Sequence, residues 1–252
     1  MPRRPLLPLL LPLALASSAC RIDTAVTVAV DEDGSGQVTV AVDLDAEATR
    51  RLPDLDEDGT SGVADLAALV RTDDLAAAGW TVDEPVEDDD GGVALAISRP
   101  FGTPDEADRI LAELTGPDGA LRRLDVSRSA SFGRTELGFS GTADLSGGLE
   151  AFGDDELAAV LDGEPLGEDA AAIEEGAGVP LSEAVTVEIT ADLAGESTVW
   201  APRLGDAPLA MDAQTTEPDV PVLVLAAVAV AAMAALAAVL VVRAVRSRRG
   251  AA

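Results

Sequence analysis

Three groups of residues in this sequence have types and spacings suited to chemistry: a single cysteine, a run of carboxylates and a cluster of arginines. The residue types that the sequence lacks exclude several catalytic mechanisms. The chain contains no His and no Lys, which excludes a histidine-based catalytic triad, histidine metal ligation and a lysine Schiff base. With 46 Asp and Glu residues, close carboxylate pairs arise throughout, and no single pair stands out as an acid–base couple. We therefore expect a protein that is not an enzyme.

The single cysteine, Cys20, follows a segment with the layout of a secretory signal. A pair of arginines opens it, residues 6–16 are apolar, and small residues lead up to the cysteine. Bacterial lipoproteins acylate a cysteine placed immediately after the cleavage position. The segment resembles such a lipobox, although Ser17 stands where leucine is usual. The sequence predicts a signal peptide over residues 1–19 and lipidation of Cys20, with ordinary cleavage or an uncleaved anchor as the alternatives.

The other end of the chain carries 21 uninterrupted apolar residues, Val222 to Val242. At about 1.5 Å of rise per residue, a helix of this length crosses the roughly 30 Å hydrocarbon core of a bilayer. Four arginines follow, and the positive-inside tendency places them in the cytoplasm. We predict an extracytoplasmic domain over residues 20–217, a transmembrane helix with its flanks over 218–243 and a cytoplasmic tail over 244–252. The expected location is the cell membrane, with both a lipid anchor and a single membrane pass.

The segment between the two ends is strongly acidic. From Arg21 to Asp219, 46 acids stand against 11 arginines, so this part of the chain has a net charge of −35. A surface of this sign repels phosphate backbones, which argues against nucleic acid as a partner. The segment is long enough for one domain with its own core, and a single cysteine allows no internal disulfide.

Alternating and helical patterns predict an α+β domain built on an antiparallel sheet with a few packed helices. A helix is expected over residues 63–78, ending at Gly79, and a second one begins after Thr103, whose spacing to Glu106 is that of a capping box. A short helix is expected over 157–161. The predicted strands are 25–30, 37–43, 93–98, 121–129, 135–145, 185–189, 197–200 and 209–214. Two of the six aromatic residues, Trp80 and Trp200, are predicted core anchors.

The order of these segments resembles the LppM-like lipoproteins of actinobacteria. The resemblance is carried by LAAAGWTV (75–82), SRPFGTPDEADRILAEL (98–114), FGRTELGFSGTADL (132–145) and LAMDAQT (209–215), which precede one terminal apolar helix. It implies an envelope protein whose outer domain binds membrane lipids or glycolipids, with phosphatidylinositol mannosides as the implied class. It supplies no catalytic residues. The alternative is a scaffold that binds a membrane protein partner through its acidic domain and transmembrane helix.

Four arginines lie close together in the middle of the sequence: Arg122, Arg123, Arg128 and Arg134. In a strand over residues 121–129, Arg122 and Arg128 are expected to share one face with the apolar Leu124 and Val126. A guanidinium beside apolar surface suits a phosphorylated lipid head above its acyl chains. The sequence therefore makes these arginines a candidate ligand site. The alternative is ordinary pairing with surrounding acids.

A run of carboxylates has the spacing of a calcium loop. Asp54, Asp56 and Asp58 alternate before Gly59, and Asp65 falls at the twelfth position of an EF-hand loop. Aspartate replaces the usual glutamate there, and a proline stands just before the run. In a chain with so many acidic residues, such a match arises easily by chance. A solvated acidic loop without any cofactor is therefore the favoured interpretation, with calcium as the alternative.

Calorimetric titration of the purified chain with calcium tests this choice. We expect no heat of binding at millimolar calcium, because a loop without the bidentate glutamate has a weakened coordination shell. A saturable heat that disappears in an Asp54→Asn, Asp56→Asn variant would instead establish the calcium site.

Overall fold

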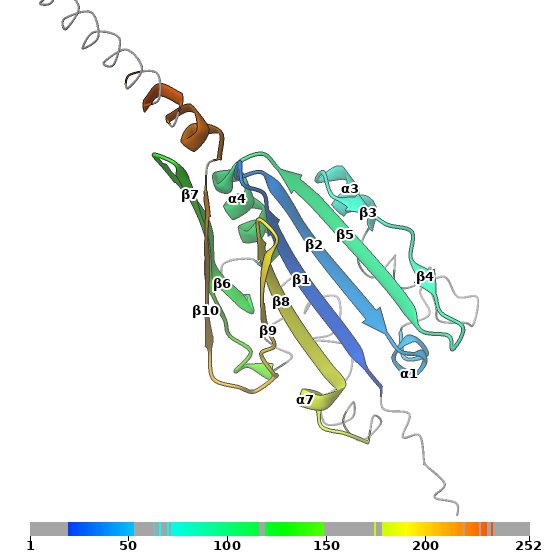
Figure 1. Cartoon of the computed structure of the whole chain (residues 1–252). Coiled ribbons are helices and arrows are strands. Elements are labelled where there is room, and N and C mark those ends of the chain that lie inside the picture. Colours follow the sequence, from blue (N-terminus) through cyan, green and yellow to red (C-terminus); the bar gives the residue numbers. More distant parts are fainter. Residues whose placement is uncertain are drawn as a thin grey trace, which may run out of the picture.

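The structure is a computed structural model, and its arrangement is shown in Figure 1. It describes residues 20–52, 63, 66, 70, 72–115, 119–148, 174, 178–218, 220–226, 228–230 and 233. The predicted signal peptide (1–19), the cytoplasmic tail (244–252) and the predicted helix over 157–161 lie outside these residues.

The larger of two sheets has seven strands in the order β3-β5-β2-β1-β8-β9, with β4 also paired to β5. Its strands are β1 (Ile22–Val30), β2 (Gly36–Leu44), β3 (Thr81–Val82), β4 (Val86–Glu87), β5 (Val93–Phe101), β8 (Val185–Leu193) and β9 (Glu196–Trp200). Its pairs are antiparallel except for β1 with β8, which run parallel over the full length of both strands.

The smaller sheet is antiparallel throughout, in the order β10-β7-β6. Its strands are β6 (Leu121–Ser131), β7 (Arg134–Ala143) and β10 (Leu209–Pro218). The labelled helices are α1 (Ala46–Thr49), α3 (Thr72–Ala77), α4 (Pro104–Thr115) and α7 (Leu181–Ala184). Helix α4 lies against β6 of this sheet and against β2 and β5 of the larger one, so it joins the two sheets.

The first hairpin forms as its sequence predicts. Every second residue of β1 from Val26 to Val30 is buried, which is the period of a strand with one face in the core. The turn closes with the Asp31 N–H donating to the Ser35 carbonyl at 2.7 Å, and Gly34 adopts a φ of +87° that favours glycine. Hydrogen bonds from Ser35 to the Asp33 carboxylate lower the pKa of Asp33 and stabilise the turn.

The start of α4 also follows its sequence signal. The Glu106 N–H donates to Thr103 Oγ1 at 3.3 Å, and the Glu106 carboxylate accepts from the Gly102 N–H at 2.9 Å. The reciprocal bond thus goes one residue earlier than in a standard capping box. At the other predicted helix end, Gly79 has a φ of +91° just after α3, which confirms the termination.

One core joins the two sheets and α4. The buried face of β1 packs in the same hydrophobic cluster as Ile110 and Leu111 of α4 and Leu137 and Phe139 of β7. A second, smaller cluster lies at the other end of the larger sheet, around Leu44. The smaller sheet and α4 therefore cover the apolar face of the larger sheet and leave its other face, lined by Ala and Thr side chains, at most half-buried.

The predicted α+β class is confirmed, but the prediction of an antiparallel sheet is only partly right. The larger sheet is mixed, because β8 returns beside β1 in the parallel direction across most of the chain. The sequence places the segments over 185–189, 197–200 and 209–214 last among the predicted strands, where they are expected to close the sheet at its edge. Instead β8 lies next to the central strand β1 and only β9 forms an edge. Hairpin patterns report neighbours in sequence and carry no information on this long-range pairing.

The chain beyond β10 is helical at residues 220–226, 228–230 and 233. Within the part of the chain that the structure describes, no helix is both long and apolar enough to cross a bilayer. The predicted transmembrane helix over 218–243 extends well past these residues, so it remains a prediction.

A glycine at the start of β2 tests how closely the strands approach. A Cβ on Gly36 would lie 1.9 Å from the Ala29 carbonyl oxygen and 2.6 Å from the Phe101 ring. Because a backbone atom cannot move aside, we expect Gly36→Ala to destabilise the domain by about 1–3 kcal/mol in denaturant unfolding. Gly102→Ala is the matched control, since its nearest contact would be an ordinary 3.6 Å to Glu106. Equal stability of the two variants would contradict this packing.

Candidate functional site

Cys20 lies at the beginning of the larger sheet and is buried. Its side chain is 4% exposed and packs in the cluster that contains Leu44, Ala48 and Val93. Burial raises the pKa of the Cys20 thiol, with opposing effects from the neighbouring charges of α1. The thiol is therefore neutral and shielded at neutral pH, and an acylated Cys20 has to turn its side chain out of this cluster to accommodate a lipid.

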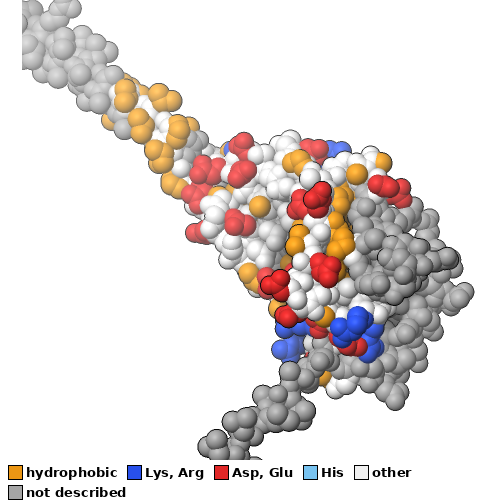
Figure 2. Space-filling model, turned by 90° about the vertical axis from the view of Figure 1, so that its right-hand side faces the viewer, with side chains coloured by type: hydrophobic (Ala, Val, Ile, Leu, Met, Phe, Trp, Pro, Cys, Tyr) orange, Lys and Arg blue, Asp and Glu red, His pale blue; other side chains and the backbone are white. Residues whose placement is uncertain are grey.

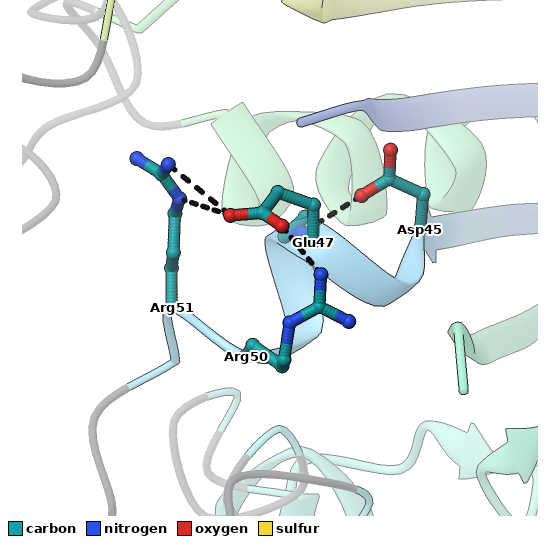
Figure 3. Close-up of polar contacts among 5 residues, drawn as sticks. Asp45, Glu47, Arg50 and Arg51 are labelled. Carbon is teal, nitrogen blue, oxygen red and sulfur yellow. Dashed lines mark hydrogen bonds and ion pairs between the residues drawn. The ribbon is translucent and has the colours of Figure 1, made fainter. Parts of the chain in front are cut away.

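The charged side chains beside Cys20 form ion pairs and a helix cap within and around α1 (Figure 3). The Asp45 carboxylate caps α1 by accepting the Ala48 N–H at 2.7 Å. The Glu47 carboxylate pairs with Arg50 and, at 3.2 Å, with Arg51. Hydrogen bonds from Arg50 and then Arg51 lower the pKa of Glu47. The cluster stabilises the short helix that covers Cys20, and its charges are already compensated.

A β-bulge decides how the predicted arginine site is arranged. The pairing of β6 with β7 shifts between Arg122 and Asp125, and Arg123 has a φ of +53°. Arg122 is paired with Thr142 and Arg128 with Leu137, five residues apart along β7. Side chains alternate along a strand, so the two arginines point to opposite faces. The prediction that they share a face is therefore wrong, because the bulge inserts an extra residue that the sequence pattern does not reveal.

Arg122 and Arg123 have partners inside the domain. Arg122 forms an ion pair with Asp144 at 3.1 Å and donates to the Gly119 carbonyl at 3.1 Å. Hydrogen bonds from Ser146, and secondarily the charge of Arg122, lower the pKa of Asp144. Arg123 donates to Thr142 Oγ1 at 3.3 Å. These two arginines hold the start of β6 in place.

Arg128 and Arg134 lie toward the opposite end of the same hairpin. The Arg128 Nε donates to the Glu32 carbonyl at 3.0 Å, so its side chain bridges from the smaller sheet to the β1–β2 turn. Arg134 donates to Ser131 Oγ at 3.1 Å and pairs with Glu136 at 3.3 Å on an exposed surface. Six residues of strand separate Arg122 from Arg128, about 20 Å, so the structure divides the four arginines into two pairs.

The remaining predicted site residues are the four candidate calcium-binding carboxylates and the two tryptophans. The carboxylates proposed for calcium, Asp54, Asp56, Asp58 and Asp65, lie outside the described residues. Among the residues that are described, no group of three or more His, Cys, Asp or Glu side chains is arranged to hold a metal ion. Trp80 is 6% exposed in the main core, which confirms it as a core anchor. Trp200 is half-buried on β9 and packs against the core, with its ring 5.7 Å from that of Phe139.

One feature at the end of the β6–β7 hairpin was not predicted. Phe132, at the turn, is 80% exposed. A Cβ on the next residue, Gly133, would lie 2.7 Å from Leu223 Cδ2, so the turn touches the helix that follows β10. The sequence did hold a signal, since residues 126–135 contain two arginines and no acid in an otherwise acidic domain.

Comparisons with known proteins add a structural likeness. No family model matches the sequence, and no curated protein matches it. Among solved structures, the chain is similar to the folded domain of LppM from Mycobacterium tuberculosis, determined by NMR. The match covers 81% of this chain and 95% of that chain, at 12% sequence identity and a TM-score of 0.37. The matched domain is of the family that the sequence resembles.

The position of β6 depends on a half-buried contact with α4 that can be tested by pH. The Asp108 carboxylate accepts the Val126 N–H at 2.8 Å. Desolvation raises the pKa of Asp108, with Asp125 and Asp105 adding to the effect. A raised native pKa means that stability is greatest below the unfolded pKa and falls as pH rises through the native pKa.

We therefore expect Asp108→Asn, which keeps an acceptor oxygen and removes the charge, to be at least as stable as the parent at pH 7. This advantage should shrink at about pH 3, where the parent carboxyl is protonated. Asp108→Ala leaves the Val126 N–H without its partner and should cost about 1–2 kcal/mol at both pH values. Thermal or denaturant unfolding measures all three. An Asn variant as unstable as the Ala variant would contradict this account.

Proposed function

We propose that this chain is a membrane-anchored envelope lipoprotein whose extracytoplasmic domain binds lipid or glycolipid without catalysis. One observation carries the anchoring: large apolar side chains stand exposed on the helical residues directly after β10, clear of the domain in Figure 2. They are 45% to 68% exposed and comprise Val220, Leu223, Val224, Leu225, Val228, Val230 and Met233. Such a surface is unfavourable in water and favourable in hydrocarbon.

The two proposed anchors leave the domain at opposite ends. Cys20 directly precedes β1, whose other end carries the turn that Arg128 contacts. The helix after β10 meets the β6–β7 turn at that same far end, as Figure 1 shows. Nine residues of strand span about 30 Å. If both anchors enter one bilayer, the strands must therefore lie along its surface, with the domain outside and the C-terminus in the cytoplasm.

The proposed lipid contact uses the arginine pair near the helix. Arg128 and Arg134 lie at the end of the hairpin that approaches the apolar helix, within reach of headgroups at a membrane surface. Guanidinium groups bind phosphate by charge-assisted hydrogen bonds. Arg122 lies at the far end and is paired with Asp144, whereas Arg134 pairs with Glu136 on an exposed surface near the helix. Arg128 and Arg134 lie on opposite faces of the smaller sheet, so we propose that each contacts anionic headgroups separately at this end of the hairpin.

Paired double variants of the full chain test this assignment. We expect Arg128→Gln with Arg134→Gln to reduce the phosphatidylinositol retained by the detergent-purified chain about tenfold or more, since each charge-assisted bond contributes about 1.5–3 kcal/mol. Arg122→Gln with Arg123→Gln changes the charge equally and should retain lipid as the parent does. Mass spectrometry of extracted lipid measures retention, and unfolding curves check that both variants fold.

Equal retention in the two double variants would reject the arginine assignment. A parent chain that carries no lipid under native purification would reject lipid binding altogether. In that case a protein partner that dissociates in moderate salt would support the scaffold function, since the net charge of −35 favours a basic partner.

A further inference from the structure

We propose that the tip of the β6–β7 hairpin, residues 129–134, is a second membrane contact that places Phe132 at the boundary between headgroups and acyl chains. The proposal rests on the membrane anchoring described above and adds a surface to it. It commits to bilayer lipid as the occupant. Four properties of the hairpin tip support the proposal: its projection beyond the neighbouring turn, the strands that hold it in position, its charge and its contact with the apolar helix.

The hairpin tip reaches beyond the rest of the domain. Arg128 marks the level of the β1–β2 turn, because its Nε is 3.0 Å from the Glu32 carbonyl oxygen. Phe132 is four residues further along, which is about 13 Å of extended strand. The β6–β7 hairpin therefore projects past the neighbouring turn, toward the helix that leaves the domain (Figure 1).

The hairpin tip is also a supported structure. The β6–β7 ladder continues to its last pair, Ser131 with Arg134, and β10 pairs with β7 up to Arg134 and Pro218. Three strands thus hold the turn in position. The exposure of Phe132, at 80%, follows from this placement, since a turn fixed at the end of a three-stranded sheet cannot fold its aromatic ring back into the core.

The charge of the hairpin tip differs from that of the domain. The hairpin tip contains one charged residue, Arg134, which pairs with Glu136 at 3.3 Å, whereas the segment from Arg21 to Asp219 has a net charge of −35. Acidic residues lie beside it on both neighbouring strand segments: Glu136 on β7, which pairs with Arg134, and Glu217 on β10, which is in register with Thr135. The hairpin tip therefore carries far less negative charge than the domain as a whole, which lowers its repulsion from an anionic bilayer.

The contact with Leu223 fixes where the hairpin tip lies. Leu223 is the second residue of the 21-residue apolar run, so it marks the point where the chain enters hydrocarbon. Gly133 is so close to it that a Cβ there would lie 2.7 Å from Leu223 Cδ2. Whatever the tilt of the domain, the adjacent Phe132 is then at the membrane boundary, where amphipathic and aromatic side chains are favoured.

A fluorescent label on the hairpin tip tests the proposal in the full chain. The variant carries Cys20→Ala and Phe132→Cys, is labelled with an environment-sensitive dye and is reconstituted into vesicles of phosphatidylcholine and phosphatidylglycerol. We expect emission at shorter wavelength and quenching by nitroxide on the lipid acyl chains. The matched control is Val86→Cys, also exposed at 63% but on β4, which pairs with the far end of β5.

A third label, at Met233→Cys inside the apolar run, separates the two proposals. Quenching at 233 and 132 with a weaker effect at 86 supports the hairpin contact. Quenching at 233 together with equal signals at 132 and 86 overturns the hairpin contact and leaves the membrane anchor intact. No quenching at 233 overturns the anchor and the contact that rests on it. Purified vesicles contain no partner protein, so a tip that serves a protein interface gives the unquenched result.

Discussion

The architecture depends on the central strand β1, which pairs along its whole length with β2 on one side and β8 on the other. Its alternate valines, Val26, Val28 and Val30, form the base of the core on which α4 and the smaller sheet pack. Because β1 begins two residues after Cys20, this one strand also sets the distance between the proposed lipidation position and the far end of the domain. The fold and the anchoring geometry therefore share one constraint.

The bulge in β6 has a comparable effect on the site. An extra residue between Arg122 and Asp125 reverses which face of the sheet the later side chains of the strand occupy. Leu124 and Val126 therefore face the core, and Arg128 reaches across to the larger sheet. Without it, Arg122 and Arg128 would lie on the same face, still about 20 Å apart along the strand. With it, Arg122 lies on the outer face and pairs with Asp144, while Arg128 contacts the β1–β2 turn.

These features give the domain two electrostatically distinct regions. Most of its surface is acidic and is repelled by anionic lipid, whereas residues 126–135 carry only positive charge. The apolar residues after β10 emerge beside that basic region and touch it through Leu223. The apolar helix and the β6–β7 turn therefore lie together at one edge of the domain, which is the edge that the proposed anchoring would place at a bilayer.

The sequence by itself determined the local structure. It predicted the first hairpin around residues 31–36, the start of α4 after Thr103 and the strand positions, because turns, caps and alternation act between neighbouring residues. Tertiary structure decided the parallel pairing of β1 with β8, the opposite faces of Arg122 and Arg128, and the burial of Cys20. Each of these depends on contacts between segments far apart in the chain, or on one inserted residue that reverses a face without changing the pattern.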